Sequence, residues 1–105
     1  MLELIILAIL PCIDFNEPLA QHIHVHLDGI SIPANIGISP GCFRYIHTHD
    51  DTGWLHLESN EQRDFTLQQF FDLWDKPTVG YSVTINNQTA DFATPLNDND
   101  RVIIK

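Results

Sequence analysis

The chain has 105 residues and a mass of 12.0 kDa, a length that fits one domain because two self-sufficient hydrophobic cores need a longer chain. Hydrophobic residues make up 44% of the sequence and charged residues 18%, a composition that excludes an intrinsically disordered protein. Fourteen acidic side chains against five basic ones give a net charge of −9 with histidine neutral, which argues against nucleic acid or an anionic membrane surface as a partner.

Residues 1–20 begin with an apolar run at positions 4–10, which is shorter than the ~20 residues needed to span a bilayer. No spanning membrane segment is therefore predicted. A secretory signal peptide has a basic region before such a run and small residues after it, whereas here Glu3 precedes the run and Pro11 follows it. We interpret residues 1–20 as an apolar segment followed by a linker. Three interpretations of the apolar segment stay open: a truncated export segment, an extra buried strand and an anchor. The folded domain is assigned to residues 21–105.

Histidine alternates with aliphatic residues over positions 22–27, and this period of two predicts a strand. One face of it carries His22, His24 and His26, and the other carries Ile23, Val25 and Leu27. Asp28-Gly29 is typical of a type I′ turn. Residues 30–32 are therefore expected to return as a second strand that pairs Val25 with Ile32.

A second hairpin is expected from residues 43–49 and 54–58, around a turn at residues 50–53. A four-residue turn places three pairs on one face, namely His47 opposite His56, His49 opposite Trp54 and Tyr45 opposite Glu58. The aliphatic residues of this hairpin, Ile46, Leu55 and Leu57, take the other face. Each hairpin thus presents its histidines on the face opposite its aliphatic residues.

A helix is predicted to begin after Thr66 and to end before Pro77. Thr66 as N-cap and Gln69 three residues later form a capping box, and Phe65 and Phe70 stand at the positions of a hydrophobic staple. Residues at the spacing i, i+3, i+4 and i+7 form an apolar stripe that has to be buried, namely Leu67, Phe70, Phe71 and Trp74.

The rest of the chain predicts a strand at residues 81–85, a turn at Asn86-Asn87, an irregular stretch, a turn at 98–100 and a strand at 102–104. This order indicates an α+β fold, a single small domain with a mainly antiparallel sheet and one helix packed on one face. Residues 95–104, a leucine followed by an acidic turn and a final strand, resemble the end of β-grasp domains and imply a β-grasp-like arrangement. Asn87-Gln88-Thr89 also matches the glycosylation pattern, with Asn87 as acceptor.

All six histidines lie between positions 22 and 56, and imidazole is the commonest metal ligand in proteins. Alternate residues of a strand are ~6.5–7 Å apart, close enough for two side chains to bind one ion. We therefore predict a Cu(II) or Zn(II) site whose ligands come from one set: His24, His26, His47, His49 and His56 first, then His22 and Asp50. Asp51 and Glu58 are further carboxylates that can complete the site or orient an imidazole.

The two cysteines, Cys12 and Cys42, lack the Cys-x-x-Cys spacing of zinc ribbons and redox sites. In an exported protein they can form a disulfide that closes a loop of about 30 residues. Two alternatives stay open, namely a pair of buried thiols and a role for Cys42 as a soft metal ligand.

Other interpretations of the histidine face also stay open. A polar strand face can be solvated without further function, and clustered histidines can form a pH switch because their ordinary pKa is ~6.5. The protein can also be an interaction module, a homo-oligomer that packs Tyr45, Trp54 and the histidines on a second copy and adds its apolar N-terminal strand to a neighbour's sheet. No enzyme is predicted, since the chain is too short for an amidohydrolase barrel and shows no Ser, Cys or Lys nucleophile constellation.

Five sequence blocks between residues 22 and 76 belong together: His22-x-His24-x-His26-Leu27-Asp28, Pro33-Ala34-Asn35-Ile36-Gly37-Ile38, His47-Thr48-His49-Asp50, His56-Leu57-Glu58-Ser59 and Phe65-Thr66-Leu67-x-x-Phe70-Phe71-x-x-Trp74. As a set they resemble a family of small His-rich domains found in exported or membrane-anchored proteins of archaea and bacteria. The resemblance implies a periplasmic or extracellular location more than it implies a mechanism.

Overall fold

The computed structural model describes residues 10–105. Most of the apolar run, for which an export segment, a strand or an anchor was predicted, lies outside the described residues. The elements in chain order are β1 (Gln21–Asp28), β2 (Ile38–Ser39), β3 (Cys42–Phe43), β4 (Ile46–His47), β5 (Trp54–Ser59), α1 (Leu67–Trp74), β6 (Val83–Ile85), β7 (Gln88–Ala90) and β8 (Arg101–Ile104).

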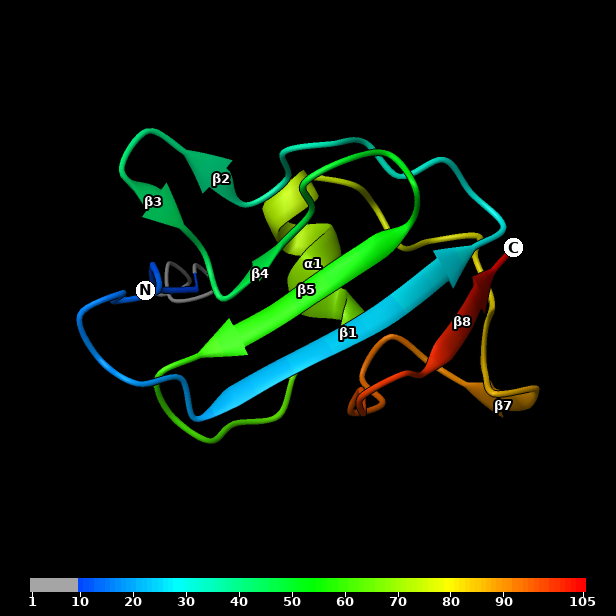
Figure 1. The fold of residues 1–105 in the computed structure, drawn as a ribbon. Helices are drawn as coiled ribbons and strands as arrows, with labels where there is room; N and C mark the ends of the chain where they lie inside the picture. The colour runs from blue at the N-terminus through cyan, green and yellow to red at the C-terminus, as the bar shows by residue number, and fades with distance from the viewer. Residues whose placement is uncertain (1–9) are drawn as a thin grey trace, which may run out of the picture.

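Six strands form one sheet in the order β4-β5-β1-β8-β6-β7, and β2 and β3 form a separate two-stranded ladder. All strand pairs are antiparallel except β1 and β8, which run parallel at the middle of the large sheet (Figure 1). Residues 10–105 contain one helix, α1, which packs against a single face of this sheet (Figure 1). The predicted α+β class with one helix on one face is confirmed, and the parallel pair makes the sheet a mixed one.

The core lies between the aliphatic face of the sheet and α1. Val25 and Leu27 of β1 and Leu55 and Leu57 of β5 are buried there, as their alternation with polar residues predicts. From the helical stripe, Leu67, Phe70 and Phe71 are fully buried, and Trp74 packs against the same cluster from its edge. Because successive strand residues point to opposite faces, the histidines between these aliphatic residues lie on the face away from α1.

The predicted first hairpin is wrong. Residues 30–32 form no strand, and β1 instead pairs with β5 on one side and with β8 on the other. Both hydrogen-bonding edges of β1 are therefore occupied by strands distant in sequence, which leaves no edge for residues 30–32. Ile32 is nevertheless buried, from a loop rather than from a ladder.

The second hairpin is shorter than predicted, but its register is confirmed. Ile46 pairs with Leu57, and His47 pairs with His56. The ladder stops at His47, so His49 does not pair with Trp54, whose strand partner is His26 of β1.

Tyr45 does not share the histidine face. A bend at this residue interrupts the alternation, and its side chain is buried in the core. The Arg63 guanidinium lies 5.4 Å from the Tyr45 ring centroid and 5.9 Å from that of Phe65, beside the N-terminus of α1. Tyr45 is therefore not available to the interface with a second copy for which it was predicted.

The start of α1 follows the predicted capping box. The Thr66 hydroxyl accepts a hydrogen bond from the Gln69 N–H, and the Gln69 side chain accepts one from the Thr66 N–H. The helix ends at Trp74, earlier than Pro77 requires, because Asp75 takes a left-handed conformation and its N–H bonds back to Asp72 and Phe71.

We expect Thr66→Ala to lower the free energy of unfolding by about 1 kcal/mol, since the N–H groups of the first turn lose the hydroxyl acceptor. Urea unfolding measures the change. The conservative variant Thr66→Ser keeps the acceptor, so equal losses in both variants would contradict the role of the cap.

In the C-terminal third, the turn at Asn86-Asn87 and the final strand are confirmed. Both asparagines have positive φ, 52° and 68°, as a tight turn between β6 and β7 requires. Strand β7 was missed because its residues, Gln88–Ala90, are polar or small and largely exposed, so they carry no apolar alternation.

Residues 10–13 form a strap across residues 42–45. Cys12 and Cys42 are joined by a disulfide with a Cα–Cα separation of 5.3 Å. Beside it, the Ile13 N–H donates to the Phe43 carbonyl at 2.7 Å, and the Arg44 guanidinium donates to the Leu10 carbonyl at 2.8 Å. Leu10 and Ile13 are buried in the core. Within residues 10–105, no helix has the length and apolar character needed to cross a membrane.

Candidate metal centre

Three imidazoles meet on the face of the sheet away from α1. His47 comes from β4, His56 lies opposite it on β5, and His49 follows two residues after His47. Their ligand atoms all lie within 4.8 Å of one another. The His47 and His56 rings are stacked with centroids 5.4 Å apart, and the His49 ring stands edge-on to both at 4.8 Å and 4.6 Å. We refer to His47, His49 and His56 as the trio.

The local fold explains why these rings converge. The β4–β5 register places His47 directly across from His56 on one face. The Phe43 ring packs beside both His47, at 5.3 Å, and His49, at 5.6 Å. Phe43 thus forms one wall of the trio, and nothing in its sequence position indicated this contact.

His47 is oriented by a backbone carbonyl. Its Nδ1 lies 2.9 Å from the Arg44 carbonyl oxygen, which can only accept, so Nδ1 carries a proton. The side chain is 0% exposed, and the buried Nε2 has no hydrogen-bond partner. The unprotonated nitrogen of a neutral His47 is therefore Nε2, the atom left free for a metal.

Burial keeps two members of the trio, His47 and His56, uncharged at pH 7. Burial lowers the pKa of His56 from the ordinary 6.5 to about 4, with further lowering by His49, His24 and His47. Burial also lowers the pKa of His47, against the opposing effects of the Arg44 hydrogen bond and the Glu58 carboxylate. At pH 7 both imidazoles are neutral, which is the state that binds metal ions.

The lowered pKa of His56 predicts an acid-sensitive fold. Between pH 6.5 and 4 the unfolded chain binds a proton at His56 that the folded protein does not, so the free energy of unfolding falls as the pH falls through this window. Because solvent reaches part of the ring and screens the charge, we expect a loss of about 2 kcal/mol rather than the full value of the shift.

Urea unfolding of the metal-free protein at pH 7, 5.5 and 4 measures this loss, with His56→Gln as control. The glutamine side chain does not titrate, so the difference in unfolding free energy between the two proteins isolates His56 from the carboxylates. An equal dependence on pH in both proteins would contradict the assignment.

Two predicted ligands, His24 and His22, extend the trio along β1. The His24 ring stands edge-on to His56 at 4.7 Å, and the His22 ring lies 4.9 Å from His24. The two residues come from the strand that pairs with β5, so they line the same face without joining the group of close ligand atoms.

His26 is directed elsewhere. Its Nε2 lies 3.0 Å from the Thr52 carbonyl oxygen and its Nδ1 lies 3.3 Å from a carboxylate oxygen of Asp28. The ring packs edge-on to Trp54 at 4.8 Å. Because both nitrogens face oxygen acceptors, the structure does not bring His26 into the trio.

The remaining predicted site residues do not belong to the group of close ligand atoms. Asp50 is exposed and accepts hydrogen bonds from the Thr52 hydroxyl and N–H, which lower the pKa of its carboxyl. Asn87 lies in the exposed β6–β7 turn. Cys42 is held in the disulfide, so neither cysteine is a free thiol, and Cys42 is not the soft ligand considered above.

Glu58, one of the carboxylates expected to complete the site or to orient an imidazole, contacts two histidines. One carboxylate oxygen lies 3.1 Å from His47 Nε2, and the other lies 2.9 Å from His22 Nε2.

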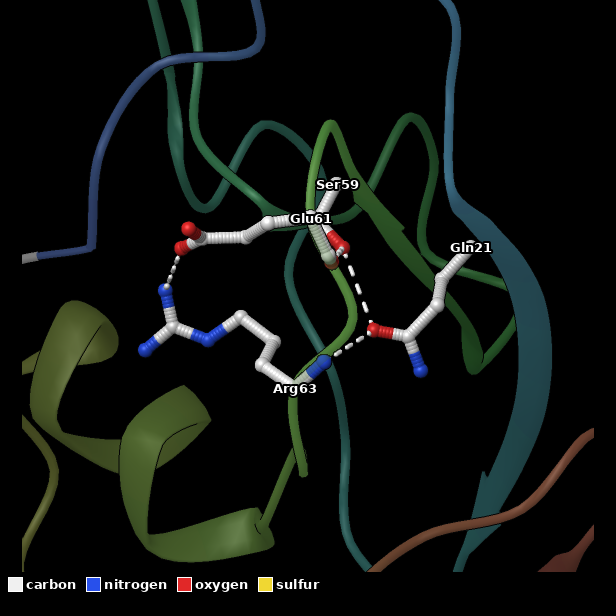
Figure 2. Close-up of polar contacts among 4 residues, drawn as sticks. All are labelled: Gln21, Ser59, Glu61 and Arg63. Carbon is white, nitrogen blue, oxygen red and sulfur yellow. Dashed lines mark hydrogen bonds and ion pairs between the residues drawn. The ribbon is translucent and has the colours of Figure 1, made fainter.

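The end of β5, directly after Glu58, is held by hydrogen bonds to the following loop. The Ser59 hydroxyl donates to the Glu61 carbonyl at 2.6 Å (Figure 2). Gln21 Oε1 accepts a hydrogen bond from the backbone N–H of Arg63 at 2.7 Å (Figure 2). This bond fixes the start of β1 against the loop that follows β5.

Comparison with known proteins gives no relative for this site, since no protein family profile, no curated protein and no solved structure matches the chain.

Proposed function

We propose that this protein is a small exported domain that binds one Cu(II) or Zn(II) ion through His47, His49 and His56 and serves as a metal carrier, scavenger or sensor. The observation that carries the proposal is the convergence of three imidazole ligand atoms within 4.8 Å. Three imidazole ligands suit tetrahedral Zn(II), with bonds of ~2.0–2.1 Å, and the tetragonal nitrogen and oxygen sites of Cu(II). Rotation of the exposed His49 ring brings its nitrogen closer to a bound ion.

The burial pattern of the trio supports exchange of the ion with solvent. His47 is fully buried, His56 is half-buried and His49 is exposed. A buried ligand with fixed orientation gives the site its geometry, while an exposed ligand gives an ion a path in and out. We propose binding rather than catalysis, because neither cysteine is a free nucleophile and the sequence offers no Ser or Lys nucleophile constellation beside the histidines.

The proposed export rests on the disulfide and on the resemblance to exported His-rich domains. Disulfides persist in oxidising compartments and are rare in the cytosol, and Cys12–Cys42 ties the strap to the domain. For the fold, the packing of α1 on one face of a mixed sheet supports a β-grasp-like arrangement of residues 21–105.

The test is elemental analysis of protein purified without an affinity tag, followed by Zn(II) and Cu(II) titrations at pH 7 and pH 4. We expect saturable binding of one ion per chain at pH 7 and loss of the ion at pH 4, where protons compete for the imidazoles. No saturable binding of either ion at pH 7 would overturn the proposal.

Self-assembly is the alternative, and one observation favours it. The Trp54 side chain is 42% exposed at the end of the histidine face, next to His26. Sedimentation of the metal-free protein distinguishes the two functions, since an interface built on this face gives a dimer that Trp54→Ser dissociates. A monomer at all concentrations would exclude it.

A further inference from the structure

His47 and Glu58 are in contact at a position that is largely shielded from solvent. His47 donates through Nδ1 to the Arg44 carbonyl, so Nε2 presents a lone pair. That lone pair lies 3.1 Å from Oε1 of Glu58, which is an acceptor when ionised. The nitrogen is buried and has no hydrogen bond. Two hydrogen-bond acceptors, Nε2 of His47 and the ionised Oε1 of Glu58, are therefore 3.1 Å apart. This is an ordinary distance between a donor and an acceptor.

Such an arrangement is unfavourable unless a proton or a metal cation lies between the two atoms. A buried acceptor without a partner costs about 1–3 kcal/mol, and more beside a charge. A metal ion binds both atoms at once and removes this penalty. In a tetrahedral zinc site with bonds of ~2.0–2.1 Å, neighbouring ligand atoms are about 3.3–3.4 Å apart. The observed 3.1 Å between Nε2 and Oε1 is close to that spacing.

The other carboxylate oxygen is held from outside the trio. Glu58 Oε2 lies 2.9 Å from Nε2 of His22. The Glu58 side chain is only 15% exposed, whereas His22 is 54% exposed. His22 thus restrains the carboxylate from the solvent side and leaves Oε1 directed at His47.

We propose that Glu58, whose carboxylate lies outside the group of ligand atoms that are within 4.8 Å of one another, turns Oε1 toward the ion held by the trio and is its fourth ligand, so that the site offers three imidazole nitrogens and one carboxylate oxygen. This inference rests on the proposed function and adds a ligand to its site. A charged oxygen ligand suits Zn(II) and Cu(II), whereas Cu(I) prefers thiolate and thioether sulfur. The site therefore selects a divalent ion over Cu(I), and His22 is a positioning residue for Glu58.

The variant Glu58→Gln tests the fourth ligand with two readouts. We expect it to weaken Zn(II) binding by more than about 100-fold, measured by competition with a chromogenic chelator at pH 7, because loss of a ligand costs more than the 10–100-fold loss of a group that only orients one. We expect Cu(I) affinity, measured with a Cu(I) chelator under reducing conditions, to change by less than about 3-fold. The glutamine amide can also donate to Nε2 of His47, so the urea midpoint of the metal-free protein is expected to rise.

The matched control is Glu61→Gln, which removes an exposed carboxylate from the loop after β5 and is expected to leave both affinities unchanged. Unchanged Zn(II) affinity in Glu58→Gln, in a protein whose wild type binds Zn(II), would overturn the fourth ligand alone. Equal losses for Zn(II) and Cu(I) would also overturn it, since they indicate a general distortion of the trio. Absence of Zn(II) binding by the wild type would instead overturn the proposed function.

Discussion

Replacing His49 by glutamine is expected to weaken Zn(II) binding by more than about 100-fold while leaving the fold intact. Loss of groups that only orient a ligand costs 10–100-fold in metal affinity, and removal of a ligand itself costs more. His49 is exposed, so its replacement leaves no cavity in the core. Of the three trio residues, His49 is therefore the one whose replacement is expected to change metal affinity with the smallest change in the free energy of unfolding.

The matched control is His26→Gln. It removes a histidine from the same face of the sheet, but one whose nitrogens face the Thr52 carbonyl and Asp28 rather than the trio. We expect Zn(II) affinity within about 3-fold of the wild type for this variant, by the same chelator competition. Similar losses in both variants would show that the histidines bind metal as a diffuse surface cluster and that the trio is not the site.

Removing the disulfide is expected to produce the second large effect. The Cys12–Cys42 bridge spans a sequence separation of 30 residues, and closing a loop of this size stabilises the folded state by about 3.5 kcal/mol in the chain-entropy account. We expect Cys12→Ala with Cys42→Ala to lower the free energy of unfolding by about this amount. Chemical denaturation measures it.

The same double variant is expected to weaken metal binding about 10-fold. The strap that the disulfide holds bonds to Arg44 through the Leu10 carbonyl, and the Arg44 carbonyl orients His47. Reduced and oxidised wild type provide the control, since they differ only in the bridge. Unfolding free energies that agree within 1 kcal/mol would contradict the role of the bridge.

The strand pattern of the sequence predicted that the histidines share one face of the sheet and that His47 lies opposite His56. Alternation placed the histidines opposite the aliphatic core, and the expected hairpin register brought His47 across from His56. Both inferences depend on the alternation of side chains between the two faces of a strand. Neighbouring residues determine this alternation, so it can be predicted from a short stretch of sequence. The capping box at Thr66 is local in the same sense, and it too is confirmed.

The errors come from contacts between distant segments. The turn pattern at Asp28-Gly29 favoured a hairpin, but β8, some 75 residues further along the chain, takes that edge of β1. Pairing of this kind depends on the whole sheet, so a local turn pattern cannot predict it.

The electrostatic features of the site also escaped prediction. A histidine on a polar strand face is expected to be solvated, yet His47 is fully buried beneath its neighbours. The proton on Nδ1 follows from the Arg44 carbonyl, which reaches His47 through a bend at Tyr45 that interrupts strand alternation. The contact of Glu58 with both His47 and His22 depends on the pairing of β5 with β4 and β1 together.

The most direct test of the central claim is a crystal structure of the protein loaded with one equivalent of Zn(II), with diffraction data measured on both sides of the zinc absorption edge. The anomalous difference map is expected to show one peak per chain, with nitrogen atoms of His47, His49 and His56 at ~2.0–2.1 Å. A peak elsewhere on the histidine face, or zinc bound only between copies in the crystal, would contradict the account.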